Sequence, residues 1–194
     1  MKNYHQNREK GFTLVETFVA ITILLIAVIG PLGLFSKALV DTIFAQNQIT
    51  SLYLAQEGLE LVINYKNNIQ TDECGPDDFE CLANTNPNQW LGELVECYGD
   101  EGCVISFDEN NFLISPADVE NQILNYDYSK NLYTHSVGNT SPTIFSRVIK
   151  IVPKRDPSNP DNIYAAEVVS ESRWKDRRNN FSRNTKLETV IYNY

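Results

Sequence analysis

The chain has 194 residues, enough for one globular domain of ordinary size and an accessory segment. Its 16 Lys and Arg are outnumbered by 25 Asp and Glu, which gives a formal net charge of -9. Such an acidic body repels phosphate backbones, so direct nucleic-acid binding is not expected. The only histidines are His5 and His135, and no P-loop, G-x-S-x-G or H-E-x-x-H motif occurs. The sequence therefore predicts no metal site, no cofactor and no enzyme activity.

A short basic segment precedes a long apolar one at the N-terminus. Residues 1–11 carry a local charge of about +2 from Lys2, Arg8, Glu9 and Lys10. The next 24 residues, Phe12 to Phe35, contain one charged side chain, Glu16. As a helix they would span about 36 Å, which exceeds the roughly 30 Å hydrocarbon core of a bilayer. Because basic flanks stay in the cytoplasm, we predict a single membrane-spanning helix over residues 12–35, with the rest of the chain outside the cytoplasm.

Three kinds of segment fit this pattern: a removable secretory signal, an ordinary membrane anchor and a more specialised helix. The apolar core is longer than the 7 to 15 residues typical of a secretory signal. An ordinary anchor does not explain Glu16, because a carboxylate inside an apolar span costs several kcal/mol unless it gains a partner. Glu16 is therefore a candidate functional residue.

The junction between the two segments reads K-G-F-T-L-V-E from Lys10 to Glu16. This run resembles the N-terminal signal of type IV prepilins and of type II secretion pseudopilins. The resemblance implies that a prepilin peptidase cleaves after Gly11, that Phe12 becomes an N-methylated N-terminus, and that Glu16 acts in filament assembly. Glycine suits a cleavage site because its backbone enters a protease cleft without a side chain. Residues 1–11 are accordingly predicted to be a leader peptide.

The apolar run is interrupted near its end, and an amphipathic pattern follows it. Gly30, Pro31 and Gly33 interrupt the apolar run, and proline removes a helical hydrogen bond, so we expect a kink or a short melted stretch there. Apolar residues then recur at helical spacing over residues 36–66, which predicts an almost continuous helix from Phe12 to Tyr65. Residues 54–60 (LAQEGLE) resemble a stretch common in minor pilins. Glu57 and Glu60 within it are expected to face solvent.

Residues 67–194 are predicted to form a globular head. Residues 67–102 are rich in turn-forming residues, and one short helix is expected near residues 89–96. The four cysteines, Cys74, Cys81, Cys97 and Cys103, lie in or next to this stretch. Clustered cysteines in an exported domain favour two disulfides, and of the three possible pairings loop length weakly favours Cys74 with Cys81 and Cys97 with Cys103.

A hairpin is expected at residues 104–115, and residues 144–152, 163–174 and 181–192 predict an antiparallel meander. Asp156 and Asp161 are weak calcium candidates.

These expectations combine into an α+β protein whose long N-terminal helix packs on a small antiparallel sheet, as in pilins. The resemblance implies a structural subunit, more like a minor than a major pilin, that is anchored in the cytoplasmic membrane and assembled into a surface or periplasmic filament. Its implied partners are other pilin subunits, prepilin peptidase, an inner-membrane assembly platform and membrane lipid. Adhesive or twitching pili, DNA-uptake pili and type II secretion all stay open, and so does a membrane-anchored binding module.

Overall fold

The structure is a computed structural model, and it describes residues 11, 13–73, 89–108, 111–118, 121–135, 139–175 and 182–193. Its backbone contacts divide the chain into two compact units, residues 1–45 and 46–194. One helix, α1 (Leu14–Glu73), contributes to both units. The division at Ala45 follows contacts within the chain and does not test the membrane boundary predicted at Phe35, which stays a prediction.

Helix α1 is longer than predicted at its C-terminal end, which lies at Glu73 rather than near Tyr65. It is also helical through Gly30, Pro31 and Gly33. Of the two expected outcomes, the melted stretch is therefore absent from the structure, whereas the kink stays a prediction. The physical reason is that Pro31 removes a single hydrogen bond, whereas the apolar turns on both sides keep theirs.

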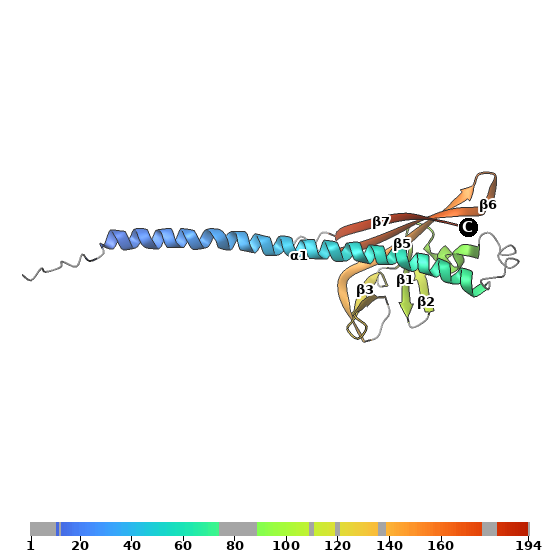
Figure 1. Cartoon of the computed structure of the whole chain (residues 1–194), viewed down its shortest axis with the longest axis horizontal. Coiled ribbons are helices and arrows are strands. Elements are labelled where there is room, and N and C mark those ends of the chain that lie inside the picture. The colour runs from blue at the N-terminus through green and yellow to red at the C-terminus, as the bar shows by residue number, and fades with distance from the viewer. Residues whose placement is uncertain are drawn as a thin grey trace, which may run out of the picture. The chain divides into compact units, whose positions relative to one another are not determined.

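After α1 the described chain forms a short helix and seven strands (Figure 1). These elements are η1 (Gln89–Cys97), β1 (Cys103–Asp108), β2 (Asn111–Pro116), β3 (Ile123–Asp127), β4 (Leu132–Thr134), β5 (Thr140–Asp156), β6 (Asn159–Lys175) and β7 (Ser182–Tyr192). All seven strands belong to one sheet, and every pair of neighbouring strands is antiparallel. The α+β class and the antiparallel sheet are thus confirmed.

Strand β5 organises the sheet. It pairs with β6 along its length, and β6 pairs with β7, which gives the predicted meander. On its other side β5 pairs with β3 and, at Cys103 and Ile149, with β1. The predicted hairpin is β1 and β2. The pair β3 and β4 was not predicted, because its strands, Ile123–Asp127 and Leu132–Thr134, are too short to show a clear alternation.

The head segment of α1 covers one face of the sheet. Apolar side chains from the helix, from η1 and from the strands form the main core; its buried members include Val62, Tyr65, Trp90, Leu91, Leu94, Ile105, Ile149, Ile151, Val168 and Ile191. A smaller cluster joins Leu54 to Leu124, Phe145 and Trp174. Three hydrogen bonds also join α1 and η1 to the sheet. Ser51 Oγ donates to the Ser172 carbonyl at 3.2 Å, Lys66 Nζ to the Tyr192 carbonyl at 2.6 Å, and Trp90 Nε1 to the Ile163 carbonyl at 3.0 Å.

Gly58 lies at a close approach between the helix and the sheet. A Cβ atom placed on Gly58 would stand 2.3 Å from Ser170 Oγ and 3.1 Å from Arg147 Cδ. Atoms at such distances overlap, so a side chain at this position would push the helix away from β6. Packing against Ser170 and Arg147 therefore favours glycine at this position of the LAQEGLE stretch.

Candidate processing and assembly site

The predicted cleavage site lies just before the first turn of α1. Gly11 is exposed and not helical, and nothing lies within 4 Å of the position that its Cβ would occupy. Phe12, the predicted new N-terminus, lies outside the described residues. The helix begins at Leu14. No described atom outside its chain neighbours crowds the position that a side chain at Gly11 would occupy.

Thr13 fixes the start of the helix. Its hydroxyl accepts a hydrogen bond from the Glu16 amide at 3.3 Å, and its carbonyl accepts one from the Thr17 amide at 3.2 Å. A threonine hydroxyl bound to the amide three residues later is the usual arrangement of an N-cap. Glu16 consequently stands in the first helical turn, where the exposed amides of the helix favour a negative charge.

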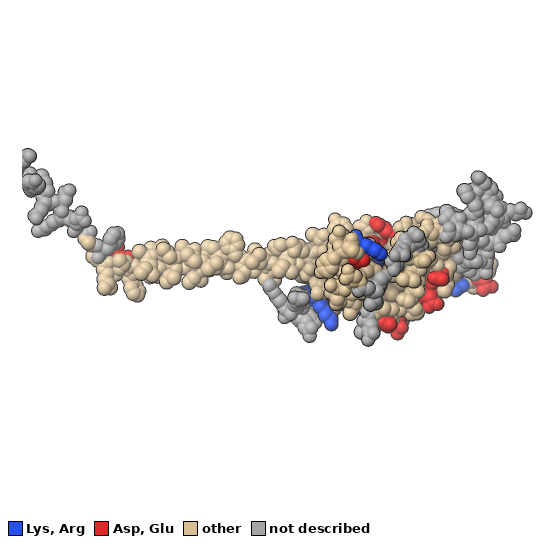
Figure 2. Space-filling view, turned by 90° about the horizontal axis from the view of Figure 1, so that it is seen from below, with Lys and Arg blue, Asp and Glu red and all other residues tan. Residues whose placement is uncertain are grey.

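The first 22 residues of α1, Leu14 to Phe35, expose apolar side chains on every side. Leu14 is 81% exposed, Phe18 72% and Leu34 73%. The most apolar window of 18 residues has a mean hydropathy of 2.7, and none of that window is buried. In the view of Figure 2 this stretch shows almost only uncharged side chains. By length and composition the helix suffices to cross a membrane, and a buried core helix of a soluble protein would not show such exposure.

Hydroxyl groups inside this apolar stretch are bound to the helix itself. Thr17 Oγ1 donates to the Leu14 carbonyl and Thr22 Oγ1 to the Phe18 carbonyl, both at 2.8 Å. Each hydroxyl proton is therefore satisfied without water, which lowers the cost of placing threonine in hydrocarbon. In the described part of residues 14–35, Glu16 is the only charged side chain.

One of the two predicted disulfides is present. Cys97 and Cys103 are bonded, and both residues are fully buried. The bond ties the end of η1 to the start of β1, next to Gly102. That glycine has φ of 74°, and its Cβ would stand 2.5 Å from the Ile149 carbonyl oxygen. The pairing of Cys97 with Cys103 is confirmed, whereas Cys74 and Cys81 lie outside the described residues.

Arg147 is the polar centre of the head and was missed by sequence analysis. It is 1% exposed; it donates to the carbonyls of Leu54 at 3.2 Å and Ile105 at 3.4 Å, and its Nη1 lies 3.3 Å from Glu57 Oε2. Burial lowers the pKa of Arg147, and the nearby carboxylate opposes that shift. The Glu57 side chain is 42% exposed, as expected of a solvent-facing residue, but its ion pair with Arg147 was not predicted. The sequence did carry a signal for this position: Arg147 alternates with the buried residues Phe145 and Ile149 along β5, which predicts that it faces the core.

His135 lies beside this cluster. Burial lowers the pKa of His135 from 6.5 to about 4, and the positive charge of Arg147 acts in the same direction. With Cys97 and Cys103 bonded to each other, neither is a free nucleophile for this histidine. The described residues of this region therefore supply no catalytic cysteine.

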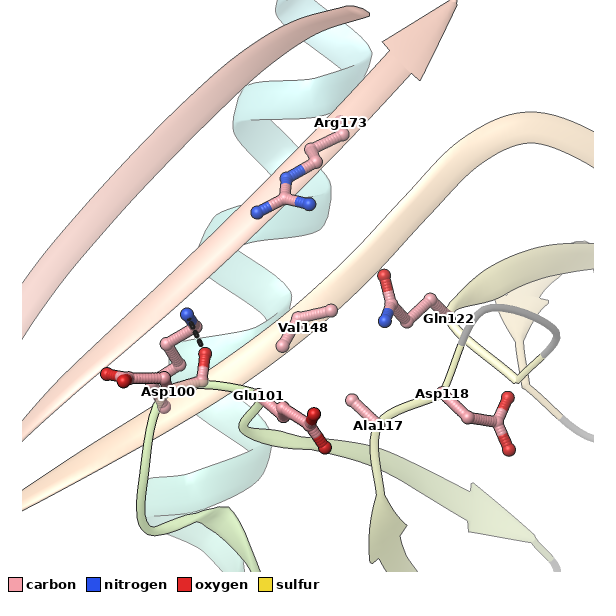
Figure 3. A pocket seen from close by; sticks show the side chains of 8 residues that line it. Asp100, Glu101, Ala117, Asp118, Gln122, Val148 and Arg173 are labelled. Atoms are coloured by element: carbon pink, nitrogen blue, oxygen red, sulfur yellow. Dashed lines mark hydrogen bonds between the residues drawn. The ribbon is translucent and has the colours of Figure 1, made fainter.

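A polar hollow of about 380 Å³ lies on the head between β5, β6 and the loops around residues 100 and 118. Figure 3 shows Arg173, Gln122, Asp100, Glu101 and Asp118 around a floor of Val148 and Ala117. Its cations already have partners. Lys150 donates to the Asp100 carbonyl, and Arg173 binds Glu171 through two hydrogen bonds of 2.8 and 2.9 Å.

Nothing in the described part of the chain groups three or more metal-binding side chains. At the weak calcium candidate, Asp156 Oδ1 accepts the Ser158 amide at 2.8 Å and so closes the turn between β5 and β6. The Asp161 amide donates to Asn159 Oδ1 at 3.3 Å. Both aspartates thus take part in local turn contacts.

Comparison with known proteins returned one finding, a match of residues 6–30 to the prokaryotic N-terminal methylation motif. No curated protein and no solved structure matches the chain. The matched segment contains Gly11, Phe12 and Glu16, the residues around the exposed backbone and the capped helix start. Residues 6–30 thus carry the type IV prepilin-like signature, a motif that indicates a pilin- or pseudopilin-like precursor of the kind that prepilin peptidase processes.

Proposed function

We propose that the chain is a minor structural subunit of a type IV pilus or of a related type II secretion pseudopilus, and that it is not an enzyme. The observation that carries the proposal is the motif at the start of an apolar helix with uncovered sides. Such a helix leaves water only by entering lipid or by packing against other helices. A subunit that moves from membrane to filament uses both environments in turn.

Glu16 supplies the chemistry of assembly in this proposal. Cleavage after Gly11 frees the cationic amine of Phe12, four residues before the carboxylate. Alone in hydrocarbon each charge costs several kcal/mol, whereas a pair between neighbouring subunits offsets part of that cost. The amine exists only after cleavage, so an uncut precursor lacks the cation. Processing therefore precedes docking for a chemical reason.

Location and topology follow from the same segment. The basic leader stays in the cytoplasm, residues 12–35 span the cytoplasmic membrane, and the head lies outside the cytoplasm. The assembly platform and other pilin subunits then meet the helix within the membrane. The resemblance of residues 54–60 to a stretch common in minor pilins favours a minor subunit over a major one.

Mass spectrometry of protein extracted from membranes tests the processing step. An N-terminus at methylated Phe12 is expected in a host with an active prepilin peptidase. Retention of residues 1–11 there contradicts the proposal and favours a membrane-anchored binding module. A bulky residue in place of Gly11, as in Gly11→Leu, should block cleavage because it fills the open space beside the scissile bond.

The assembly step has its own test. Glu16→Gln keeps size and hydrogen bonding but removes the charge, so it should be processed and inserted normally and yet enter sheared filaments poorly. Asp41→Asn is the matched control, because it removes a carboxylate from the same helix outside the motif. Wild-type amounts of the Gln variant in filaments would show that the charge is not needed.

A further inference from the structure

Strand β7 forms an edge of the sheet. Within the described residues it pairs only with β6. The Asn193 amide donates to the Tyr164 carbonyl at 3.1 Å, and these two residues continue the β6–β7 register, in which Tyr192 faces Ala165. Hydrogen-bonded pairs alternate along an antiparallel ladder. Odd-numbered residues of β7 therefore bond to β6, and even-numbered residues direct their amides and carbonyls away from the sheet.

One contact supports this assignment and limits the open edge. The carbonyl of Tyr192, an even-numbered residue, accepts Lys66 Nζ at 2.6 Å, so it does point away from β6. That carbonyl is occupied. Among the described residues nothing pairs with the edge from Asn184 to Val190, whose midpoint is Leu187.

The charged side chains of this edge are complementary to those of a second copy of the same edge. Lys186 and Glu188 stand two residues apart, on the face of the sheet opposite α1, and they form an ion pair within the strand. A second copy of β7, placed antiparallel with Leu187 facing Leu187, brings Lys186 of each copy opposite Glu188 of the other. Asn184 then faces Val190. Every outward amide and carbonyl from residue 184 to 190 finds a partner, about eight hydrogen bonds in all.

Charge selects this register over its neighbours. A slip of two residues in one direction places Lys186 opposite Lys186, and a slip in the other direction places Glu188 opposite Glu188. Like charges directly opposite each other on antiparallel strands are destabilising, whereas opposite charges are favourable. On the inner face the selected register joins the two half-buried Leu187 side chains. We propose that β7 is a self-association edge, at which two copies of this chain join their sheets about a two-fold axis at Leu187.

The two-fold axis fixes how the partners are oriented. Two contacts give the direction of α1 along the head. Ser51 of α1 binds Ser172, which pairs with Thr185 of β7. Further along the helix, Lys66 binds Tyr192, further along β7. Helix and β7 therefore run in the same direction. A two-fold that reverses β7 also reverses the head segment of α1. In the joint sheet the head segments of α1 in the two copies therefore run in opposite directions.

A charge exchange tests the proposal on the full chain in detergent micelles. The association of Lys186→Glu with itself and of Glu188→Lys with itself should each weaken by about tenfold, because two cross-strand pairs become repulsive. An equimolar mixture of the two variants should recover wild-type association, since each then meets its opposite charge. Sedimentation measures all four samples, and any association through α1 is common to them. A monomeric wild type, single variants that associate like wild type, or a mixture that fails to recover would each overturn the proposal.

Cross-linking gives an independent reading of the register. Leu187→Cys places two thiols at a non-hydrogen-bonded pair, whose Cα atoms lie about 4.5 Å apart, within disulfide range. Mild oxidation should give a product of doubled mass. Val190→Cys is the matched control, because in this register residue 190 faces Asn184 and not itself. Equal cross-linking of the two variants would contradict the proposed axis.

Discussion

Gly58→Ala separates the packing of the head from the intrinsic preference of its helix. Alanine is about 1 kcal/mol better than glycine in a helix interior, so an uncovered position would gain stability from the change. In the structure the new methyl would stand 2.3 Å from Ser170 Oγ and 3.2 Å from Ser170 Cβ. Overpacking of this kind typically costs about 1 to 3 kcal/mol. The added strain at two close contacts should exceed the gain, so we expect a net loss of about 1 to 2 kcal/mol.

Urea unfolding followed by tryptophan fluorescence measures this effect, because Trp90 and Trp174 both lie buried in the head. Ser170→Ala removes the hydroxyl that the new methyl meets first. In that background Gly58→Ala should be close to neutral, and the double-mutant cycle should give a coupling energy of about 1 kcal/mol or more. A Gly58→Ala variant more stable than wild type would show that helix and sheet do not approach as closely as described.

Three further predictions concern the head. Reduction of the Cys97–Cys103 bond, counted by alkylation, should cost about 2 kcal/mol, because the bond closes a loop with a sequence separation of 6. Lys66→Met should cost about 1 to 2 kcal/mol in urea unfolding and increase amide exchange at the end of β7, since the Tyr192 carbonyl loses its donor. The folded-state pKa of His135, about 4, lies below its unfolded value of 6.5, so the unfolded chain binds more protons between these pH values. Stability should therefore fall as pH drops from about 6.5 to about 4, by about 3 kcal/mol in total, and His135→Gln should remove that component.

The elements that the sequence predicted well are those with a local physical cause. The apolar run from Phe12 to Phe35 and the amphipathic spacing after it define α1, and β-branched and aromatic residues define β5, β6 and β7. The prediction overestimated the length of the turn between β5 and β6, because it ended one strand at residue 152 and began the next at residue 163. The charged residues and prolines on both sides of the turn are part of the extended strands, and only Pro157 and Ser158 separate β5 from β6.

The contacts that position the helix on the sheet could not be predicted in the same way. Arg147, on β5, meets the Leu54 carbonyl 93 positions earlier in the chain, and no local pattern specifies that separation. Glu57 looked like an ordinary solvent-facing acid because its partner lies on a distant strand. The reason for Gly58 is likewise visible only once β6 is in place. Local periodicity predicts elements, whereas their mutual register depends on pairs that only the fold brings together.

The same helix meets two different requirements along its length. In the head it buries one stripe, with Leu54 and Val62 at 2% and 0% exposure, because the sheet covers that face. Among the first 22 residues of α1, by contrast, Ile29 and Phe35 stay 65% and 67% exposed, and no part of the described chain covers them. At roughly 25 cal/mol for each Å² of apolar surface, a rod of such side chains is strongly unfavourable in water. The isolated chain is therefore incomplete, and lipid or other subunits must supply the cover that its own fold does not provide.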